Sequence, residues 1–251
     1  MDTHNFNQYQ QYQDPIEVQN VESVSTAKTF LSRVFSWMFL GLATTGLLAY
    51  YFAATPSLIG ALYNPLSGGM SMLGYVVMFA PFALVLLMSF GINRLSYPAM
   101  VLTFLVFSAL MGMSLSFIFL AYAAASIYMV FFITAGLFGT MALLGYTTHT
   151  DLTRFGSLMM MLLIGVIIAS VVNFFMHSAT FDYVISFICV AVFTGLTAYD
   201  VQKLKNIGGQ VNVQSGDASA GKLSILGALT LYLDFINLFL ALLRIFGGRK
   251  N

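Results

Sequence analysis

Seven long apolar segments, separated by short polar turns, make up most of the chain after residue 27. A helix of about twenty residues, rising about 1.5 Å per residue, spans the hydrocarbon core of a bilayer. The segments lack the strict alternation of a membrane β-strand, so we predict an all-α polytopic membrane protein with seven transmembrane helices. The predicted spans are residues 34–54, 70–90, 99–121, 126–146, 157–176, 181–203 and 225–246.

The composition supports this class. Of 251 residues, 59% are hydrophobic and 8% are charged, and no Asp or Glu occurs between Glu22 and Asp151. These values exclude an ordinary soluble domain and a disordered chain. The single cysteine, Cys189, excludes an intramolecular disulfide. The net charge of +1 gives no indication of a nucleic-acid partner. The expected partner is the lipid bilayer.

Residues 1–27 are polar, contain four acids and have no Lys or Arg. They lack the basic start and apolar core of a secretory signal. We expect a flexible polar tail here, followed by a seven-helix transmembrane domain over residues 28–251.

The basic residues predict the orientation. Seven spans place all the Lys and Arg of the connecting segments on one side, which the positive-inside rule makes cytoplasmic together with the N-terminus. These residues are Lys28, Arg33, Arg94, Arg154, Lys203, Lys205 and Lys222. Arg249 and Lys250 lie on the other side, so the last segment is either a full span with tolerated charges or an incomplete one. Its length favours a full span.

Small residues predict where helices approach each other closely. Ser108, Gly112 and Ser116 recur at a spacing of four within one segment. Ala135, Gly136 and Gly139 repeat the feature in the next segment. Such residues let helix backbones come close in a membrane, so both segments are expected to use these faces for helix contacts.

The last segment carries an acid near its middle. A charged side chain there costs about 2.5–3.5 kcal/mol on insertion scales, so an intramembrane acid is by default a functional residue. Thr230, Asp234, Asn237, Ala241 and Arg244 follow one another at steps of 4, 3, 4 and 3 and share one helix face. This face should turn away from lipid. The alternative is a packing carboxylate that neighbouring hydroxyl groups satisfy.

The rest of the last segment is apolar, and we expect Leu238 and Leu242 to face outward. The preceding segment ends with a second acid, Asp200, which alone is equally well explained as a helix-end residue paired with Lys203. If the last helix begins a turn early, near Lys222, the carboxyl groups of the two consecutive helices can meet in the inner half of the membrane.

Thr197, Thr230 and Asn237 would then line a polar pocket around Asp200 and Asp234. Such a pocket can share a proton, hold a cation or perform acid–base chemistry. Both carboxylates are suitable ligands for a hard cation such as calcium, and no other cofactor is expected.

Three stretches carry a family resemblance: GYTTHTDL, TGLTAYDVQKLKN and ILGALTLYLDFINLFLALLRIFG. They resemble the Bax inhibitor-1 (transmembrane Bax inhibitor motif) family, particularly its bacterial inner-membrane members, and the similarity extends over residues 27–248. The resemblance implies a seven-helix fold with a central last helix and a pH-sensitive calcium leak. It also implies that Asp200 and Asp234 are the pH-sensing pair, with an arginine partner. Arg94 is the candidate partner, a few residues beyond its helix.

Two other functions remain open at this point. An intramembrane aspartyl protease also uses two membrane aspartates, and Tyr199-Asp200 matches half of its motif. The other half, Gly-x-Gly-Asp, is absent before Asp234. The second alternative is a non-conducting regulator of stress or cell-death type that binds other membrane proteins. The residues name no protein partner.

Overall fold

The structure, a computed structural model, describes residues 15–64, 69–211, 218–248 and 250. Helices dominate this part of the chain. They are α1 (Pro15–Ala54), α2 (Pro56–Leu62), α3 (Met72–Gly91), α4 (Tyr97–Leu115), α5 (Ile118–Ala121), α6 (Ala124–Thr147), α7 (Thr153–Met176), α8 (Ala179–Gln210) and α9 (Ala218–Phe246). The short strands β1 (Tyr63–Asn64) and β2 (Gly69–Met70) pair antiparallel beside α2.

Seven helical segments within the described ranges are long and apolar enough to cross a membrane. They include Ser25–Ala54 of α1, and α4 and α5 together form one of them, Tyr97–Ala121. The prediction of an all-α polytopic membrane protein is therefore confirmed.

Several helix boundaries differ from the prediction. Helix α1 begins at Pro15, so residues 15–27 are helical where we expected a flexible tail, while residues 1–14 lie outside the described residues. The segment between the last two predicted spans is shorter than expected, because α8 continues to Gln210 and α9 begins at Ala218. Ala220 and Ser224 are buried, so packing stabilises the added turns of α9.

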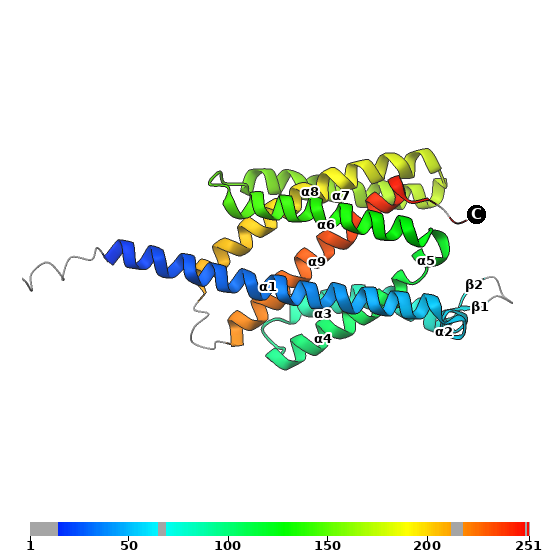
Figure 1. Ribbon diagram of the computed structural model, residues 1–251, viewed down its shortest axis with the longest axis horizontal. Coiled ribbons are helices and arrows are strands. Elements are labelled where there is room, and N and C mark those ends of the chain that lie inside the picture. Colours follow the sequence, from blue (N-terminus) through cyan, green and yellow to red (C-terminus); the bar gives the residue numbers. More distant parts are fainter. Residues whose placement is uncertain (1–14, 65–68, 212–217, 249, 251) are drawn as a thin grey trace, which may run out of the picture.

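The helices form two groups with one helix between them. Figure 1 shows α1, α3 and α4 on one side and α6, α7 and α8 on the other, with α9 crossing between them. Helix α9 packs against α1, α4, α6 and α8. The two groups also touch directly where Phe30 of α1 meets Gly208 of α8.

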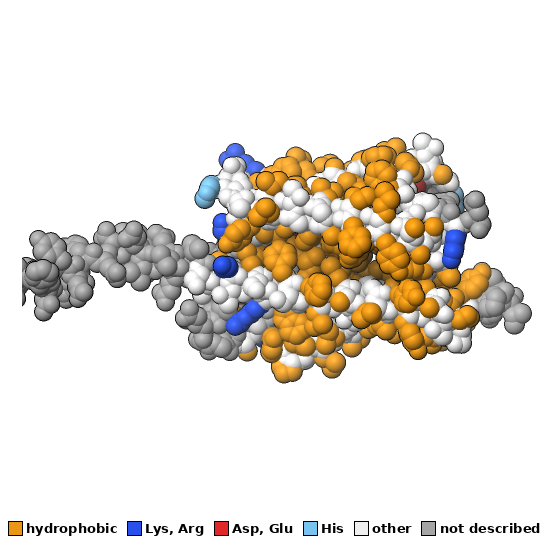
Figure 2. All heavy atoms as spheres, in the orientation of Figure 1, with side chains coloured by type: hydrophobic (Ala, Val, Ile, Leu, Met, Phe, Trp, Pro, Cys, Tyr) orange, Lys and Arg blue, Asp and Glu red, His pale blue; other side chains and the backbone are white. Residues whose placement is uncertain are grey.

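Charges lie at the two ends of the bundle, and hydrophobic side chains cover the sides (Figure 2). One end holds the start of α1, the α3–α4 and α6–α7 turns, and the junction of α8 with α9. We call it the lysine-rich end. Its basic residues are Lys28, Arg33, Arg94, Arg154, Lys203, Lys205 and Lys222. Large exposed side chains between the ends, such as Phe39, Leu47 and Phe132, form the apolar belt that a bilayer requires.

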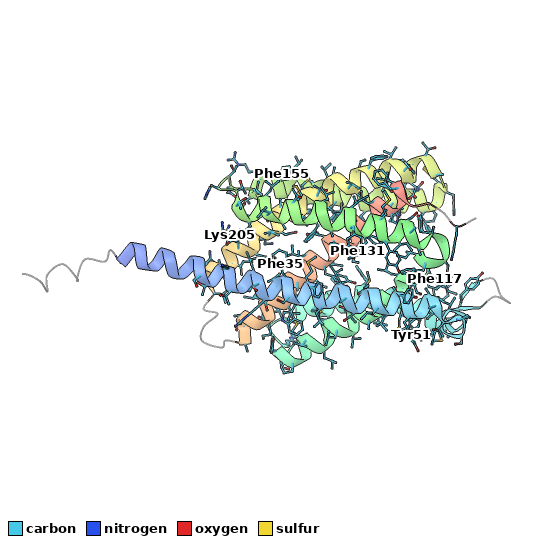
Figure 3. All side chains as sticks on the ribbon, viewed as in Figure 1. Phe35, Tyr51, Phe117, Phe131, Phe155 and Lys205 are labelled. Atoms are coloured by element: carbon cyan, nitrogen blue, oxygen red, sulfur yellow. The ribbon has the colours of Figure 1, made fainter. Side chains whose placement is uncertain are left out.

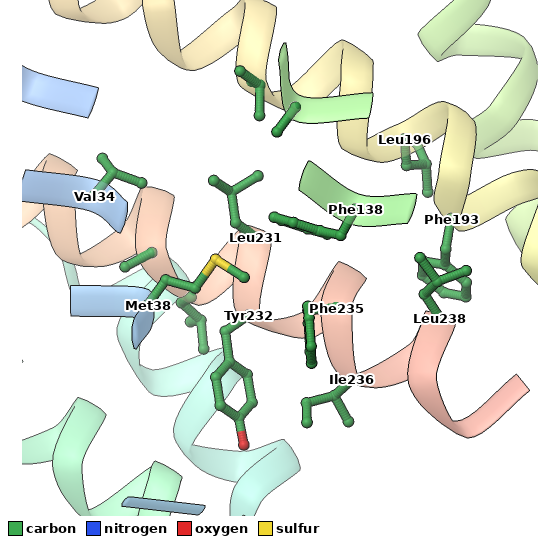
Figure 4. Packing of buried hydrophobic residues seen from close by; sticks show 14 of the residues in the cluster. Val34, Met38, Phe138, Phe193, Leu196, Leu231, Tyr232, Phe235, Ile236 and Leu238 are labelled. Carbon is green, nitrogen blue, oxygen red and sulfur yellow. The ribbon is translucent and has the colours of Figure 1, made fainter. Parts of the chain in front are cut away.

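Helix α9 supplies much of the core. Leu231, Tyr232 and Leu238 are completely buried. Figure 4 shows side chains of α9 directed toward both helix groups, where they meet residues such as Val34 of α1 and Phe138 of α6. The expectation that Leu238 and Leu242 face outward is wrong, because other helices contact α9 on several sides and its apolar faces therefore meet protein.

The first predicted small-residue contact is present, and the second is present only in part. Ser108, Gly112 and Ser116 are buried, and a Cβ at Gly112 would lie 2.7 Å from the carbonyl oxygen of Thr45, so α4 approaches α1 closely. In the next segment, Ala135 packs against the core, but the prediction is wrong for Gly136 and Gly139, since a Cβ at either position meets nothing within 4 Å.

Candidate acidic site within the membrane span

Two carboxyl groups meet inside the bundle. Helices α8 and α9 follow one another in the chain, run antiparallel and pack along their length. The early start of α9 brings Asp234 to Asp200, and their side chains lie within hydrogen-bonding reach of each other. Asp234 is 5% exposed, and Asp200 is partly buried. The structure thus brings together the two acids that the sequence singled out.

One oxygen of this pair has no partner in the protein. The Oδ2 atom of Asp234 is buried and forms no hydrogen bond with the described residues. A buried polar atom without a partner costs about 1–3 kcal/mol, and more when it is charged. A proton shared by the two carboxyl groups, or a cation bound between them, would remove this cost.

The charges around the pair are unequal. Lys203, one turn beyond Asp200 on α8, is close enough to act on it electrostatically, and its Nζ lies 5.8 Å from the centre of the Tyr199 ring. The charge that acts on Asp234 is that of Asp200. Two ionised carboxylates about 5 Å apart would repel by about 3 kcal/mol at an effective dielectric constant near 20. The arrangement therefore favours one shared proton or a bound cation.

Within the described residues Arg94 forms no salt bridge with this pair. It is exposed on the α3–α4 turn. Within the described ranges one salt bridge is found, between Arg244 and Asp182 at 3.4 Å, at the end of the bundle opposite the lysine-rich end. Lys203 acts on Asp200 electrostatically but forms no salt bridge with it within the described residues.

The three expected lining residues differ in burial. Thr197 is completely buried, Asn237 is half-buried and Thr230 is exposed. Each donates a hydrogen bond to a carbonyl of its own helix, at 2.7, 2.8 and 3.1 Å respectively. Their oxygen atoms keep the capacity to accept further bonds. Thr230 and Asn237 lie along the edge of α9 that the other helices cover least.

Two glycines fix the part of α8 that precedes Asp200. A Cβ at Gly145 of α6 would collide with the carbonyl oxygen of Ala198, and one at Gly156 of α7 would enter the ring of Tyr199. Glycine lets the three helices approach closely at this level. The backbone that carries Asp200 is therefore seated against both α6 and α7.

A polar clamp joins α8 to the α6–α7 turn. The side-chain amide of Gln202 donates to the carbonyl oxygen of Thr150 and accepts from the backbone N–H of Leu152, both at 2.8 Å. Lys205 donates to the carbonyl oxygen of Tyr146 at 2.8 Å, and its Nζ lies 5.0 Å from the centre of that ring. Figure 3 shows Lys205 at the lysine-rich end of α8.

The start of α9 is held in a similar way. Lys222 donates to the carbonyl oxygens of Ile92 and Leu95, at 3.0 and 3.2 Å. Lysine suits the free carbonyls at the end of a helix. The sequence reasoning used Lys205 and Lys222 only to set the orientation and gave Gln202 no role. The one available signal was the position of Lys205 and Lys222 just outside predicted spans, with Gln202 at the end of one.

The described residues contain no group of three or more His, Cys, Asp and Glu side chains that could hold a metal ion. His149 is exposed on the α6–α7 turn. A cation at the acidic site would therefore have two carboxylate ligands, Asp200 and Asp234, and would complete its shell with carbonyl, hydroxyl or water oxygens. Calcium and magnesium accept such a mixed oxygen set.

The chain is similar to a family of membrane proteins over most of its length. A family model described as "Inhibitor of apoptosis-promoting Bax1" matches residues 27–251. The "Inner membrane protein YbhL" of Escherichia coli (strain K12) is 46% identical over 223 residues, which cover 89% of this chain and 93% of that protein. An "Uncharacterized protein" of Borreliella burgdorferi is 39% identical over 233 residues, covering 93% and 97% of the two chains.

Proposed function

The chain belongs to the family described as inhibitor of apoptosis-promoting Bax1, and from this premise we propose that it is a pH-sensitive cation leak channel of a bacterial inner membrane, with calcium as the expected ion. The observation that carries the proposal is the meeting of Asp200 and Asp234 inside the bundle. Two acids in contact within a membrane protein can bind protons and cations. The alternative, a carboxylate that only packs, would not make the protein sensitive to either.

The gate follows from the chemistry of the pair. With one proton between them, the carboxyl groups form a hydrogen bond that holds α8 to α9. When both are ionised, repulsion of about 3 kcal/mol at about 5 Å separates them unless a cation binds. Helix α8 is clamped to α6 and α7, so a separation at this point moves α9 relative to that whole group.

The orientation is part of the proposal. The lysine-rich end faces the cytoplasm by the positive-inside rule, which places the N-terminus inside. A test uses single cysteines in a Cys189→Ser background and a membrane-impermeant thiol reagent added outside intact cells. Cysteine at Ser57, exposed on α2, should react, and cysteine at Asn93, exposed on the α3–α4 turn, should not. The reverse pattern would overturn the orientation.

The decisive experiment measures calcium flux from liposomes that contain only this protein. Asp200→Asn and Asp234→Asn should each flatten the dependence of flux on pH between about 5.5 and 8, and the double variant should add little, because coupled groups titrate as one unit. Asp182→Asn is the matched control, since this acid pairs with Arg244 away from the site, and its pH profile should stay unchanged.

Three results would contradict the proposal. Single variants that keep the unsubstituted protein's pH profile would show that the pair is not the gate. Absence of cation flux at every pH would favour the non-conducting regulator. Cleavage of a helical reporter in the same liposomes, lost in either Asp→Asn variant, would favour the aspartyl protease instead.

A further inference from the structure

A hollow lined by apolar side chains runs along the bundle between α1 and α6. Figure 2 shows it between the two helix groups, with hydrophobic atoms at its base. It encloses about 300 Å³. Gly46 and Tyr50 of α1 form one wall, Tyr128 and Phe131 of α6 form the other, and Phe239 of α9 belongs to the floor. Phe131, labelled in Figure 3, contacts Phe239 with ring centres 6.4 Å apart.

The groove has a defined depth in the membrane. Tyr50 and Tyr128 stand four residues from the end of α1 and from the start of α6, at the end of the bundle opposite the lysine-rich end. At about 1.5 Å per residue, they lie about 6 Å inside the helix ends, a level where tyrosine is common. The two side chains are 58% and 51% exposed. The groove therefore starts at the membrane interface and continues toward the middle.

The groove offers almost no polar contact below this level. The one other hydroxyl along its walls belongs to Thr45, which is bonded to the carbonyl oxygen of Ser108 and to Tyr232. A peptide segment without regular structure would leave backbone groups unpaired here, which a membrane interior does not allow.

We propose that this groove binds one acyl chain of a phospholipid from the leaflet opposite the lysine-rich end, with the polar part of the lipid beside Tyr50 and Tyr128. The protein spans the bilayer, so hydrocarbon chains are the medium that surrounds the groove. A flexible chain restores the dispersion contacts that the floor residues would otherwise lack. The floor is α9, so the bound chain touches the helix that carries Asp234, and the site is independent of whether the protein conducts ions.

The first test reads contact between the floor and lipid chains. The chain has one tryptophan, Trp37, which packs on Phe104 and is not among the groove residues. In a Trp37→Phe background, Phe239→Trp places a reporter on the floor. Phe107→Trp places a matched reporter in the core beside Tyr232. In vesicles of phosphatidylcholine brominated on its acyl chains, tryptophan at 239 should lose most of its emission, and tryptophan at 107 should keep it.

The second test fills the groove. A Cβ at Gly46 meets nothing within 4 Å, so the side chain of Gly46→Leu starts in open space and occupies part of the groove. It should restore the emission of tryptophan at 239. A Cβ at Gly165 on α7 also meets nothing within 4 Å, and this residue lies outside the groove, so Gly165→Leu should change nothing. Equal emission from the two reporters, or unchanged quenching after Gly46→Leu, would overturn the proposal.

A third measurement avoids the tryptophan substitutions, in case these disturb folding. Mass spectrometry of the intact protein released from phosphatidylcholine vesicles counts the lipids that stay bound. The unsubstituted protein and Gly165→Leu should each retain one lipid, and Gly46→Leu should retain none. A lipid that stays bound to Gly46→Leu would contradict a defined site, and so would an unsubstituted protein that retains no lipid.

Discussion

The hydroxyl oxygen of Tyr232 lies 2.7 Å from Oγ1 of Thr45, so a single hydrogen bond joins α9 to α1 in the buried middle of the bundle. The proton of Thr45 points to the carbonyl oxygen of Ser108 at 2.8 Å, and Tyr232 must therefore be the donor to Thr45. Phe104 and Phe107 enclose the tyrosine ring at centre distances of 6.4 and 5.2 Å. One polar chain thus connects α9, α1 and α4.

Removing the two ends of this bond should cost unequal amounts. Tyr232→Phe leaves Thr45 bonded to Ser108 and should lower the free energy of unfolding by about 0.5–1.5 kcal/mol. Thr45→Val leaves the buried Tyr232 hydroxyl without its acceptor and should cost about 1–3 kcal/mol. Thr44→Val, at a neighbouring hydroxyl bonded only to its own helix, is the control and should be nearly neutral. Thermal unfolding in detergent checks this order, and equal losses for all three variants would contradict it.

The close approach of α6 to α8 predicts opposite effects of one substitution at two places. Gly145→Ala puts a Cβ against the carbonyl oxygen of Ala198 and should destabilise the protein by about 1–3 kcal/mol. Gly139→Ala on the same helix meets nothing within 4 Å and should be stabilising by up to about 1 kcal/mol, because alanine favours the helix. The unfolding midpoints of the two variants measure the difference. Similar midpoints would mean that α6 and α8 are not in close contact.

The fold and the acidic pair show how much a sequence can predict in a membrane protein. Seven spans follow from length and hydropathy alone, because lipid rejects polar backbone and side chains wherever they lie. An acid within a span is equally conspicuous, and Asp200 and Asp234 were found in this way. The faces of each helix were not, since lipid chains are as apolar as leucine and hydropathy does not distinguish protein from lipid. Leu238 and Gly139 were therefore misplaced.

The polar clamps were missed for another reason. Gln202, Lys205 and Lys222 bond to backbone carbonyls and N–H groups of turns and helix ends that are 50 or more positions away in the chain. Every residue type offers the same backbone groups, so no sequence motif marks the receiving end of such a bond. The helix packing selects it.

A prediction about pH concerns the start of α7, outside the membrane span. Asp151 accepts hydrogen bonds from the hydroxyl and the backbone N–H of Thr153 at 2.6 and 2.9 Å, and these bonds hold the pKa of Asp151 below its usual value. The stabilisation is present above the unfolded pKa of about 3.9 and is lost as the pH falls through the lower folded value. The unfolding midpoint of the unsubstituted protein should therefore drop toward that of Asp151→Asn below about pH 4.

The unfolding midpoints of a second variant check the role of these hydrogen bonds. Thr153→Val removes the hydroxyl donor and should reduce the difference between the protein and its Asp151→Asn variant at neutral pH. A gap between the midpoints of the unsubstituted protein and Asp151→Asn that stays constant from neutral to strongly acid pH would show that these bonds do not favour the charged carboxylate.

The last prediction concerns the weakly covered edge of α9. If cations pass along this edge to the acidic pair, an apolar side chain there removes oxygen ligands from a narrow path. Thr230→Leu and Asn237→Leu should each reduce calcium flux from liposomes several-fold without changing the amount of protein inserted. Thr140→Leu is the matched control for Thr230→Leu, because Thr140 is also exposed and bonds to the fourth carbonyl before it on α6. Equal flux in Thr140→Leu and Thr230→Leu would place the path elsewhere, while a loss confined to the α9 variants would extend the site from Asp234 along Thr230 and Asn237.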